Sequence, residues 1–327
     1  MNYKKSGIEI SRLGLGCMRM TNTTGYANKS ESIATIHAAL DAGIQLINTA
    51  DFYSSGYNEM LIGEALNGYK RDKAFISVKF GGLSDPKGNY YGLDVRPLTI
   101  KNYITYSLKR LKVDYIDLYQ PGRIDLGIPV EETIGAISDL VKAGYVRHIG
   151  LSEVDADTLR KANSVHPISF IESEYSLFNR RIETEILPTA RELGIGVVAF
   201  GSLAYGLLGG NWSKERIVEG ANARIPLFAK ENIEKNLSLV EALREIAEEK
   251  QITLSQIAVA WVLAKGEDII PLIGAKKVSQ IQDAIKAEDI TLSENEVKRI
   301  EAVIPESAIA GAAKSNGLLF KNGIMVR

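Results

Sequence analysis

The sequence predicts a TIM (β/α)8 barrel with an N-terminal β-hairpin as a cap. Eight short β-rich runs alternate with helical patterns along 327 residues, as in a closed parallel barrel. A glycine separates helix from strand in LDAGIQLIN, VKAGYVRHIGLS and RELGIGVVAF. An open nucleotide-binding sheet would carry a Gly-rich fingerprint, but LGLGCMRM has Arg19 where the third small residue belongs.

The strands can be placed in order along the chain. The first dozen residues, MNYKKSGIEISR, alternate like a short hairpin about residues 6 and 7, which can cover the bottom of the barrel. The eight strand-like runs that follow span residues 13–16, 44–48, 75–79, 115–119, 146–152, 169–175, 196–200 and 269–273. Gly43, Gly144 and Gly194 fit the left-handed position that ends a helix, so each marks a helix-to-strand junction.

Helical patterns fill the intervals between these runs. Apolar residues at 130, 134, 137 and 141 recur on one helix face. Pairs at capping-box spacing mark helix starts: Asn28 with Glu31, Thr253 with Gln256 and Ser293 with Glu296. No Pro- or Ser-rich linker divides the chain, so we expect one domain over residues 1–327. We expect the long connections 81–97 and 201–231 and the tail 304–327 to wall a pocket at the C-terminal end of the barrel.

The amino-acid composition limits the classes of partner that the protein is expected to bind. Lys plus Arg (39) nearly balance Asp plus Glu (40), which gives no reason to expect a nucleic acid or an anionic membrane. No long apolar run and no signal-peptide region occur, so we expect a cytoplasmic chain without a membrane span. Cys17 is the only cysteine, and the three histidines lie far apart, so we expect neither an internal disulfide nor a metal site. The expected partner is a small-molecule carbonyl substrate, bound by a monomer or a small homo-oligomer.

Two strand ends deliver a tyrosine and a lysine to the predicted mouth of the barrel. The second run ends at Asn48 and continues through INTADFYSSGYNE to Tyr53, and the third ends at Lys79. An unperturbed phenol has a pKa of about 10, and a nearby cation lowers it, so this pair suits carbonyl reduction with Tyr53 as the general acid. The alternative is structural: Tyr53 covers the barrel rim, and Lys79 pairs with a buried carboxylate such as Asp51 or Asp117.

Several segments resemble the aldo-keto reductases in order and spacing over nearly the whole chain. They read LGLGCM, INTADFYSSGYNEMLIGEAL, FISVKFG, VDYIDLYQPGRID, GYVRHIGLSEV, IESEYSLFNR, VVAFGSLAYGLLGG and PLIGAKKVSQIQDAI. The resemblance implies an NADP-dependent oxidoreductase that transfers hydride between NADPH and a carbonyl or alcohol. It also implies that Tyr53 is the proton donor and that Lys79 lowers its pKa. The DFY and QP-x-RID elements look closest to the branch that includes pyridoxal reductases.

The active-site quartet implied by the resemblance is Asp, Tyr, Lys and His, and its acidic member is missing here. Asn48 stands where the aspartate is expected. An asparagine can accept a hydrogen bond from Lys79, but it supplies no negative charge. Asp51 is an unassigned carboxylate close to Tyr53 that could supply this charge instead.

The histidine of the quartet is missing as well. Gly122 stands in its place, so we expect either water or a larger substrate ring to fill the space. Another side chain must then orient the substrate, and the candidates are Gln120, Arg123 and Tyr57. The alternative for Arg123 is a surface ion pair with Asp125.

The resemblance also implies where the cofactor binds. Lys276 and Lys277 precede a helical pattern, where ammonium and backbone N–H groups can bind a phosphate, and this favours NADPH over NADH. A solvated charge pair is the alternative for these two lysines. Phe200 matches the ring that stacks on the nicotinamide, although it equally suits packing at the rim. The implied cofactor-binding residues are Gly16, Cys17, Met18, Ser152, Glu153, Glu172, Phe200, Gly201, Ser202, Leu203, Gly274, Lys276, Lys277, Gln280 and Asp283.

These observations predict an NADPH-dependent reductase that converts an aldehyde or ketone, such as pyridoxal or another aromatic aldehyde, to the alcohol. A second class stays open, namely a catalytically weak NADP(H)-binding redox sensor or regulatory subunit. The departures that favour it are Asn48, Gly122, Glu153, Glu172 and Ala284. A non-redox reaction on the same barrel is the third possibility, and the retained Tyr53 and Lys79 weigh against it.

Overall fold

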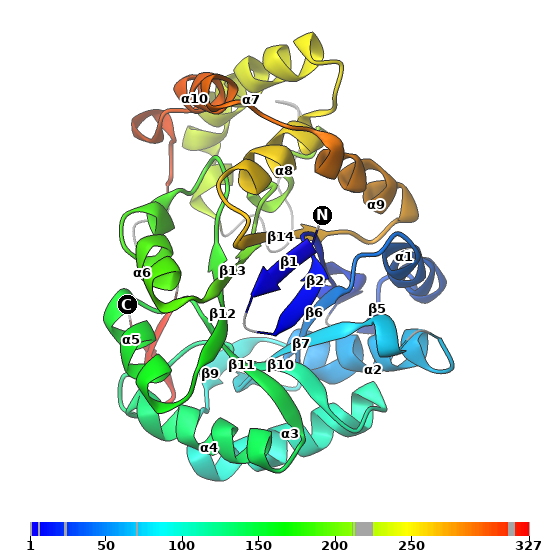
Figure 1. Cartoon of the computed structure of the whole chain (residues 1–327), viewed down its shortest axis with the longest axis vertical. Helices are drawn as coiled ribbons and strands as arrows, with labels where there is room; N and C mark the ends of the chain where they lie inside the picture. Colours follow the sequence, from blue (N-terminus) through cyan, green and yellow to red (C-terminus); the bar gives the residue numbers. More distant parts are fainter. Residues whose placement is uncertain are drawn as a thin grey trace.

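The computed structural model has a closed barrel of eight parallel strands at its centre (Figure 1). It describes residues 2–5, 7–22, 25–69, 71–210, 212, 225–312 and 318–326. The barrel strands are β3 (Gly14–Gly16), β6 (Leu46–Ala50), β7 (Phe75–Phe80), β10 (Ile116–Pro121), β11 (Val146–Ser152), β12 (Ile168–Glu174), β13 (Gly196–Phe200) and β14 (Ile269–Gly274). They are paired in this order, and β14 closes the barrel against β3. The predicted (β/α)8 barrel is confirmed, and all eight predicted strands coincide with observed ones apart from small shifts at their ends.

Helices surround the barrel (Figure 1). They are α1 (Lys29–Asp41), α2 (Tyr57–Leu66), α3 (Pro97–Leu111), α4 (Val130–Lys142), α5 (Ala156–Val165), α6 (Ile186–Leu193), α7 (Lys230–Glu249), α8 (Leu254–Ala264), α9 (Val278–Ala284) and α10 (Glu294–Val303). The predicted caps at Asn28, Thr253 and Ser293 are confirmed, since each side chain accepts a backbone N–H of the first turn. Within the described ranges, none of these helices combines the length and apolar character that a membrane crossing requires.

The N-terminal hairpin closes one end of the barrel, as predicted. It consists of β1 (Asn2–Lys5) and β2 (Ile8–Ser11), paired antiparallel. Its buried side chains Tyr3, Ile8 and Ile10 pack against apolar residues of the barrel interior, and the Tyr3 ring lies 5.0 Å from that of Phe170. Burying an apolar side chain of this size stabilises a fold by about 1.5–3 kcal/mol. The hairpin is therefore a plug for the bottom of the barrel.

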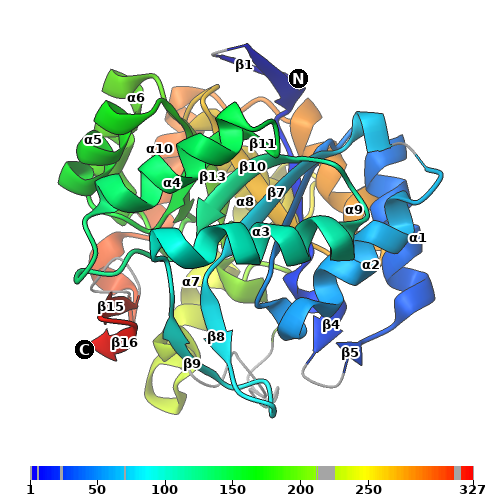
Figure 2. The same cartoon turned by 90° about the horizontal axis from the view of Figure 1, so that it is seen from below.

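The opposite end carries hairpins that the sequence analysis did not predict. They are β4 (Thr21–Asn22) with β5 (Gly25–Tyr26), β8 (Gly82–Ser84) with β9 (Tyr90–Leu93), and β15 (Leu319–Lys321) with β16 (Ile324–Val326). Figure 2 shows β8, β9, β15 and β16 together at this end and β1 at the other. Short 3-10 segments also lie here, including η1 (Met18–Met20), η2 (Tyr53–Gly56) and η5 (Ala204–Gly206). Residues 211 and 213–224 of the predicted wall 201–231, and residues 313–317 and 327 of the predicted tail 304–327, lie outside the described residues.

Candidate active site

A cavity of about 630 Å³ opens among the C-terminal ends of the barrel strands. It is lined by predicted site residues, namely Gly16, Met18, Asn48, Tyr53, Lys79, Gly122, Arg123, Ser152, Glu172, Phe200, Gly201, Ser202, Leu203, Gly274, Lys276 and Gln280. It is also lined by residues that were not predicted, including Arg19, Phe52, Ser84, Tyr90, Tyr205, Trp212 and Leu318. Several of these come from the connections expected to wall a pocket, and in this fold ligands bind at this end of the barrel.

A tight turn after β6 holds Tyr53 at the cavity. Ser54 and Ser55 adopt left-handed backbone conformations, with φ of 51° and 53°, which non-glycine residues adopt only when their surroundings enforce it. The Ser54 hydroxyl donates to the Thr21 hydroxyl at 2.9 Å, and the buried Asn58 amide donates to the Cys17 carbonyl at 2.8 Å. These bonds tie the start of α2 to the segment after β3 and so fix the position of Tyr53.

Lys79 lies beside Tyr53, as predicted. Its ammonium nitrogen is 5.3 Å from the centre of the Tyr53 ring, and the side chain is almost fully buried on β7. Burial acts to lower the pKa of Lys79, but the Glu172 carboxylate and then the Tyr53 side chain outweigh it, and the pKa is raised. Lys79 is therefore a cation in direct reach of the phenol.

The negative charge opposite Lys79 comes from Glu172 on β12. The Lys79 ammonium donates to Glu172 Oε1 at 2.8 Å and to Asn48 Oδ1 at 2.7 Å. Glu172 Oε2 accepts from Asn48 Nδ2 at 2.7 Å and from Gln120 Nε2 at 2.6 Å. All four side chains are buried. Asn48 therefore binds both ions of a pair that crosses the barrel from β7 to β12.

The other carboxylates proposed for Lys79 are engaged elsewhere. Asp51 Oδ2 accepts the Gly81 backbone N–H at 3.3 Å. Burial, and then Glu59, raise the pKa of Asp51, which disfavours its charged form. Asp117 pairs with Arg71 at 3.0 Å. The suggestion that Asp51 supplies the missing charge is wrong, because Glu172 occupies that place.

The space expected beside Gly122 is filled by Phe52. A Cβ atom on Gly122 would lie 2.9 Å from Cε1 of the Phe52 ring and 3.3 Å from the Phe80 carbonyl oxygen, and one on Gly82 would lie 2.6 Å from the same ring. The expectation of water or a substrate ring in this space is therefore wrong. This packing could have been suspected from the sequence, because an aromatic residue, Phe52, precedes Tyr53 and glycines stand at positions 82 and 122 after neighbouring strands.

Replacing Gly122 with histidine should destabilise the fold, because the imidazole and the Phe52 ring would need the same space. Overpacking of this kind costs about 1–3 kcal/mol. We expect thermal unfolding to report a lower free energy of unfolding for Gly122→His. The cost should be at least about 1 kcal/mol smaller in a Phe52→Ala background, where the ring is absent. Equal costs in the two backgrounds would contradict this packing.

Arg123 faces the cavity and does not pair with Asp125. Its Nη1 donates to the Gly122 carbonyl at 2.6 Å and to the Ser152 hydroxyl at 3.3 Å. Asp125 instead accepts backbone N–H groups from Gly127 and from the tail at Asn322 and Gly323. The structure thus contradicts the surface-pair alternative for Arg123.

Several predicted site residues lie outside the cavity. Cys17 is fully buried behind it. Tyr57 is 41% exposed and packs edge-on against Tyr26. The Gln120 side chain is buried and donates to Glu172. Glu153 accepts the Glu174 backbone N–H at 2.7 Å and lies 3.9 Å from Arg181.

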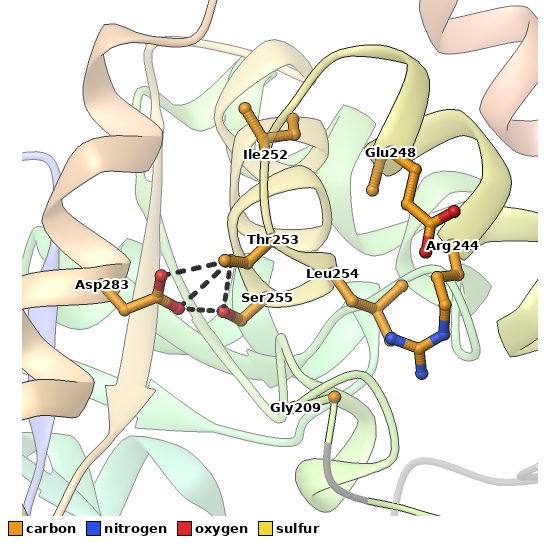
Figure 3. Close-up of a pocket in the computed structure, with 10 residues that line it drawn as sticks. Gly209, Arg244, Glu248, Ile252, Thr253, Leu254, Ser255 and Asp283 are labelled. Atoms are coloured by element: carbon orange, nitrogen blue, oxygen red, sulfur yellow. Dashed lines mark hydrogen bonds between the residues drawn. The ribbon is translucent and has the colours of Figure 1, made fainter.

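A second cavity, of about 330 Å³, lies at the N-terminus of α8 and shares Gly209 with the first (Figure 3). The Asp283 carboxylate points to this helix start, where it accepts from the Thr253 and Ser255 hydroxyls (Figure 3). It also accepts from the Gln256 amide at 2.7 Å. These bonds join α9 to the first turn of α8. Arg244, Glu248 and Leu254 also line this cavity, so its walls carry both charged and apolar side chains.

The segment between the two cavities carries the predicted lysines. Gln280 Oε1 accepts the backbone N–H groups of Lys276 and Lys277, at 2.9 and 3.1 Å. These two N–H groups are therefore already bonded and are not available to a phosphate. Both lysine side chains are exposed, and Lys276 lines the first cavity.

The similarity of this chain to known proteins extends over almost its whole length. Residues 12–305 match the family described as Aldo/keto reductase family. The "Probable aldo-keto reductase 1" of Glycine max is 38% identical in an alignment of 318 residues that covers 95% of this chain and 90% of that protein. The glycerol dehydrogenase AKR11B4 from Gluconobacter oxydans superposes with a TM-score of 0.86 at 31% identity, covering 92% of this chain and 94% of that one. The aldo-keto reductase AKR11C1 from Bacillus halodurans, in its holo form, gives 0.78 at 26%, covering 93% and 96%.

Proposed function

Because the chain belongs to the aldo/keto reductase family of oxidoreductases, we propose that it is an NADPH-dependent reductase of aromatic aldehydes, acting as one domain over residues 1–327. The observation that carries the proposal is the phenol of Tyr53 beside the buried ammonium of Lys79, both facing one cavity. A tyrosine and a lysine in this arrangement supply a proton donor and a positive charge where an alkoxide develops.

The residues present fit a dinucleotide extended across the two cavities. Ser152, Phe200 and the backbone of residues 201–203 would hold the nicotinamide end beside Tyr53. Lys276 and Lys277 would hold the 2′-phosphate, since no carboxylate among the described residues lies within ion-pair distance of either. The adenosine end would enter the second cavity at Asp283. Glu172 has both oxygens bonded inside the barrel, so we assign it to Lys79 and not to the nicotinamide amide.

A bound nicotinamide would supply the hydride for the carbonyl carbon. Tyr53 donates its hydroxyl proton to the oxygen as that oxygen gains negative charge, which completes the alcohol. Lys79 stabilises the phenolate left on Tyr53, and Glu172 and Asn48 hold the ammonium in place. Phe52, Tyr90 and Trp212 line the cavity with aromatic surface, which would limit the access of water to the reacting atoms.

The aromatic walls favour a flat substrate. Phe52 lies edge-on to Tyr53, with ring centroids 5.2 Å apart, and Tyr90 lies 5.9 Å from Phe52. Aromatic rings bind such surfaces by offset or edge contacts. An aromatic or heteroaromatic aldehyde such as pyridoxal therefore suits this cavity better than a polyol of the kind named for the Gluconobacter relative. Oxidation of NADPH in the presence of a panel of aldehydes and polyols, followed by its absorbance, tests this choice.

A catalytically weak redox sensor is the second candidate, because the quartet has lost its aspartate and histidine. Glu172 argues against it, since the Lys79 ion pair is kept with its carboxylate on another strand. NADPH binding without turnover of any aldehyde in the panel would favour the sensor.

Replacing both Lys276 and Lys277 with alanine should weaken NADPH binding by at least roughly tenfold, because each charge-assisted contact contributes about 1.5–3 kcal/mol. NADH binding should stay within about threefold, since NADH has no 2′-phosphate. Titration of cofactor fluorescence measures both affinities. Lys286→Ala with Lys298→Ala removes the same charge from exposed positions outside both cavities and serves as the control. Equal losses for the two cofactors would contradict the assignment.

A further inference from the structure

Arg123 brings a positive charge into the cavity, and no carboxylate of the described residues lies within ion-pair distance of it. It is half-buried, and its guanidinium donates hydrogen bonds to neutral acceptors, the Gly122 carbonyl oxygen and Ser152 Oγ. Its Nε is buried and has no hydrogen-bond partner among the described residues. Glu153 interacts electrostatically with Arg123 but forms no ion pair within 4 Å with it, and its carboxylate accepts the Glu174 N–H and lies 3.9 Å from Arg181.

The cavity therefore favours a ligand that brings its own negative charge. A partly buried guanidinium is costly to desolvate unless an anion binds it. Lys79 has this anion in Glu172 at 2.8 Å, whereas no carboxylate of the described chain lies within 4 Å of Arg123. The planar guanidinium binds a carboxylate through two parallel hydrogen bonds, which a lysine cannot reproduce.

Phe52 relates this cation to the reacting end of the cavity. Its ring lies beside the Tyr53 ring and also occupies the place that a Cβ atom on Gly122 would take, and Arg123 is the next residue along the chain. A substrate ring lying on Phe52 would present its carbonyl to Tyr53 and a substituent on its far side to Arg123. We propose, resting on the reductase function above, that the preferred substrates are aryl aldehydes that carry a carboxylate and that Arg123 binds this carboxylate.

The test compares 4-carboxybenzaldehyde with methyl 4-formylbenzoate, which has the same ring and no charge. In the parent protein, kcat/KM for the acid should exceed that for the ester by at least roughly tenfold, as a charge-assisted bidentate contact allows. In Arg123→Met this ratio should fall to within about threefold of unity through a higher KM for the acid, with ester kinetics unchanged within about twofold. Arg123→Lys should keep part of the preference.

A control variant and a change in salt concentration distinguish a carboxylate site at Arg123 from a general effect of charge in the cavity. Arg19→Met removes another cavity-lining cation and should leave the acid-to-ester ratio unchanged. Raising the salt concentration should reduce the ratio in the parent but not in Arg123→Met. A parent ratio near unity, an equal loss for acid and ester in Arg123→Met, or loss of the ratio in Arg19→Met instead would overturn the proposal while leaving the reductase function in place.

Binding measured without turnover distinguishes failure of the reductase function. Calorimetric titration of 4-(hydroxymethyl)benzoate and of its methyl ester into the NADP⁺-loaded protein reports the anion contact directly. Tighter binding of the acid, lost in Arg123→Met, supports the site even when no aldehyde is reduced. Equal binding of acid and ester in the parent overturns it whatever the activity.

Discussion

Tyr53→Phe is expected to lower kcat for aldehyde reduction by about 10²–10⁴-fold, the range that a positioned general acid contributes. The substitution removes one hydroxyl and keeps the ring that packs edge-on against Phe52. Because Tyr53 acts on the substrate oxygen and not on the cofactor, the affinity for NADPH should remain within about twofold, and the free energy of unfolding should change little. Steady-state kinetics and cofactor fluorescence measure these quantities on one preparation.

The matched control is Tyr106→Phe, which removes the same hydroxyl from an α3 residue that is 50% exposed and lies outside the cavity. It should reduce aldehydes at the parent rate. If Tyr53→Phe also reduced them at the parent rate, another group would be the proton donor, and the assignment of Tyr53 would have to be given up. A loss of NADPH affinity that accounts for the whole effect would place Tyr53 in cofactor binding instead.

The barrel could be predicted because its signals are local. Gly43, Gly144 and Gly194 do adopt left-handed conformations, with φ of 87°, 84° and 77°, and each is followed within a few residues by a barrel strand. The hairpin cap could be predicted for the same reason, because apolar and polar residues alternate within the first dozen residues. The hairpins at the mouth were missed because their strands are two to four residues long, which is too short for a periodic pattern.

The active site was predictable only in part, because its pairings cross the barrel. Tyr53 and Lys79 lie at the ends of neighbouring strands, and strand order alone brings them together. Glu172 is 93 residues from Lys79 along the chain, so its role depends on where β12 faces β7 across the interior. The family resemblance implied only that Glu172 binds the cofactor. Similarly, Phe52 fills the space at Gly122 through a packing contact that has no sequence pattern.

Substitutions that disturb the Lys79–Glu172 ion pair are expected to have the second large effect, on both stability and turnover. Glu172→Gln leaves the Lys79 ammonium buried without its anion, and breaking a buried pair in this way costs about 3–5 kcal/mol. Asn48→Asp is expected to be harmful for the opposite reason. It places a second carboxylate against Glu172 Oε2, 2.7 Å from the present amide nitrogen, and two adjacent carboxylates cannot both stay ionised. Each single variant should therefore lose stability and turn over aldehydes more slowly.

Exchanging the two groups should restore the site. In Asn48→Asp with Glu172→Gln, one carboxylate still faces Lys79, and the new amide can donate to the new carboxylate. In the parent protein the Gln120 amide donates to Glu172, and its buried Oε1 has no partner among the described residues. In the double variant the Gln120 amide can turn over. Its Oε1 then accepts the second N–H of the glutamine introduced at position 172. The exchange keeps the net charge and the four hydrogen bonds that join the side chains at positions 48, 79, 120 and 172. The two amide bonds to the Ser77 hydroxyl, each 3.3 Å long, are the ones it gives up.

We therefore expect the double variant to recover at least about 2 kcal/mol of stability relative to Glu172→Gln, together with most of kcat, a coupling within the range found for residues in one network. Thermal unfolding and steady-state kinetics of the four proteins complete the cycle. Asp117→Asn, which breaks the buried pair with Arg71 outside the cavity, should lose stability but keep kcat in the folded protein. If the losses of the two single variants simply added in the double variant, Glu172 and Asn48 would not share the task of holding Lys79, and the ion pair would have no part in positioning the proton donor.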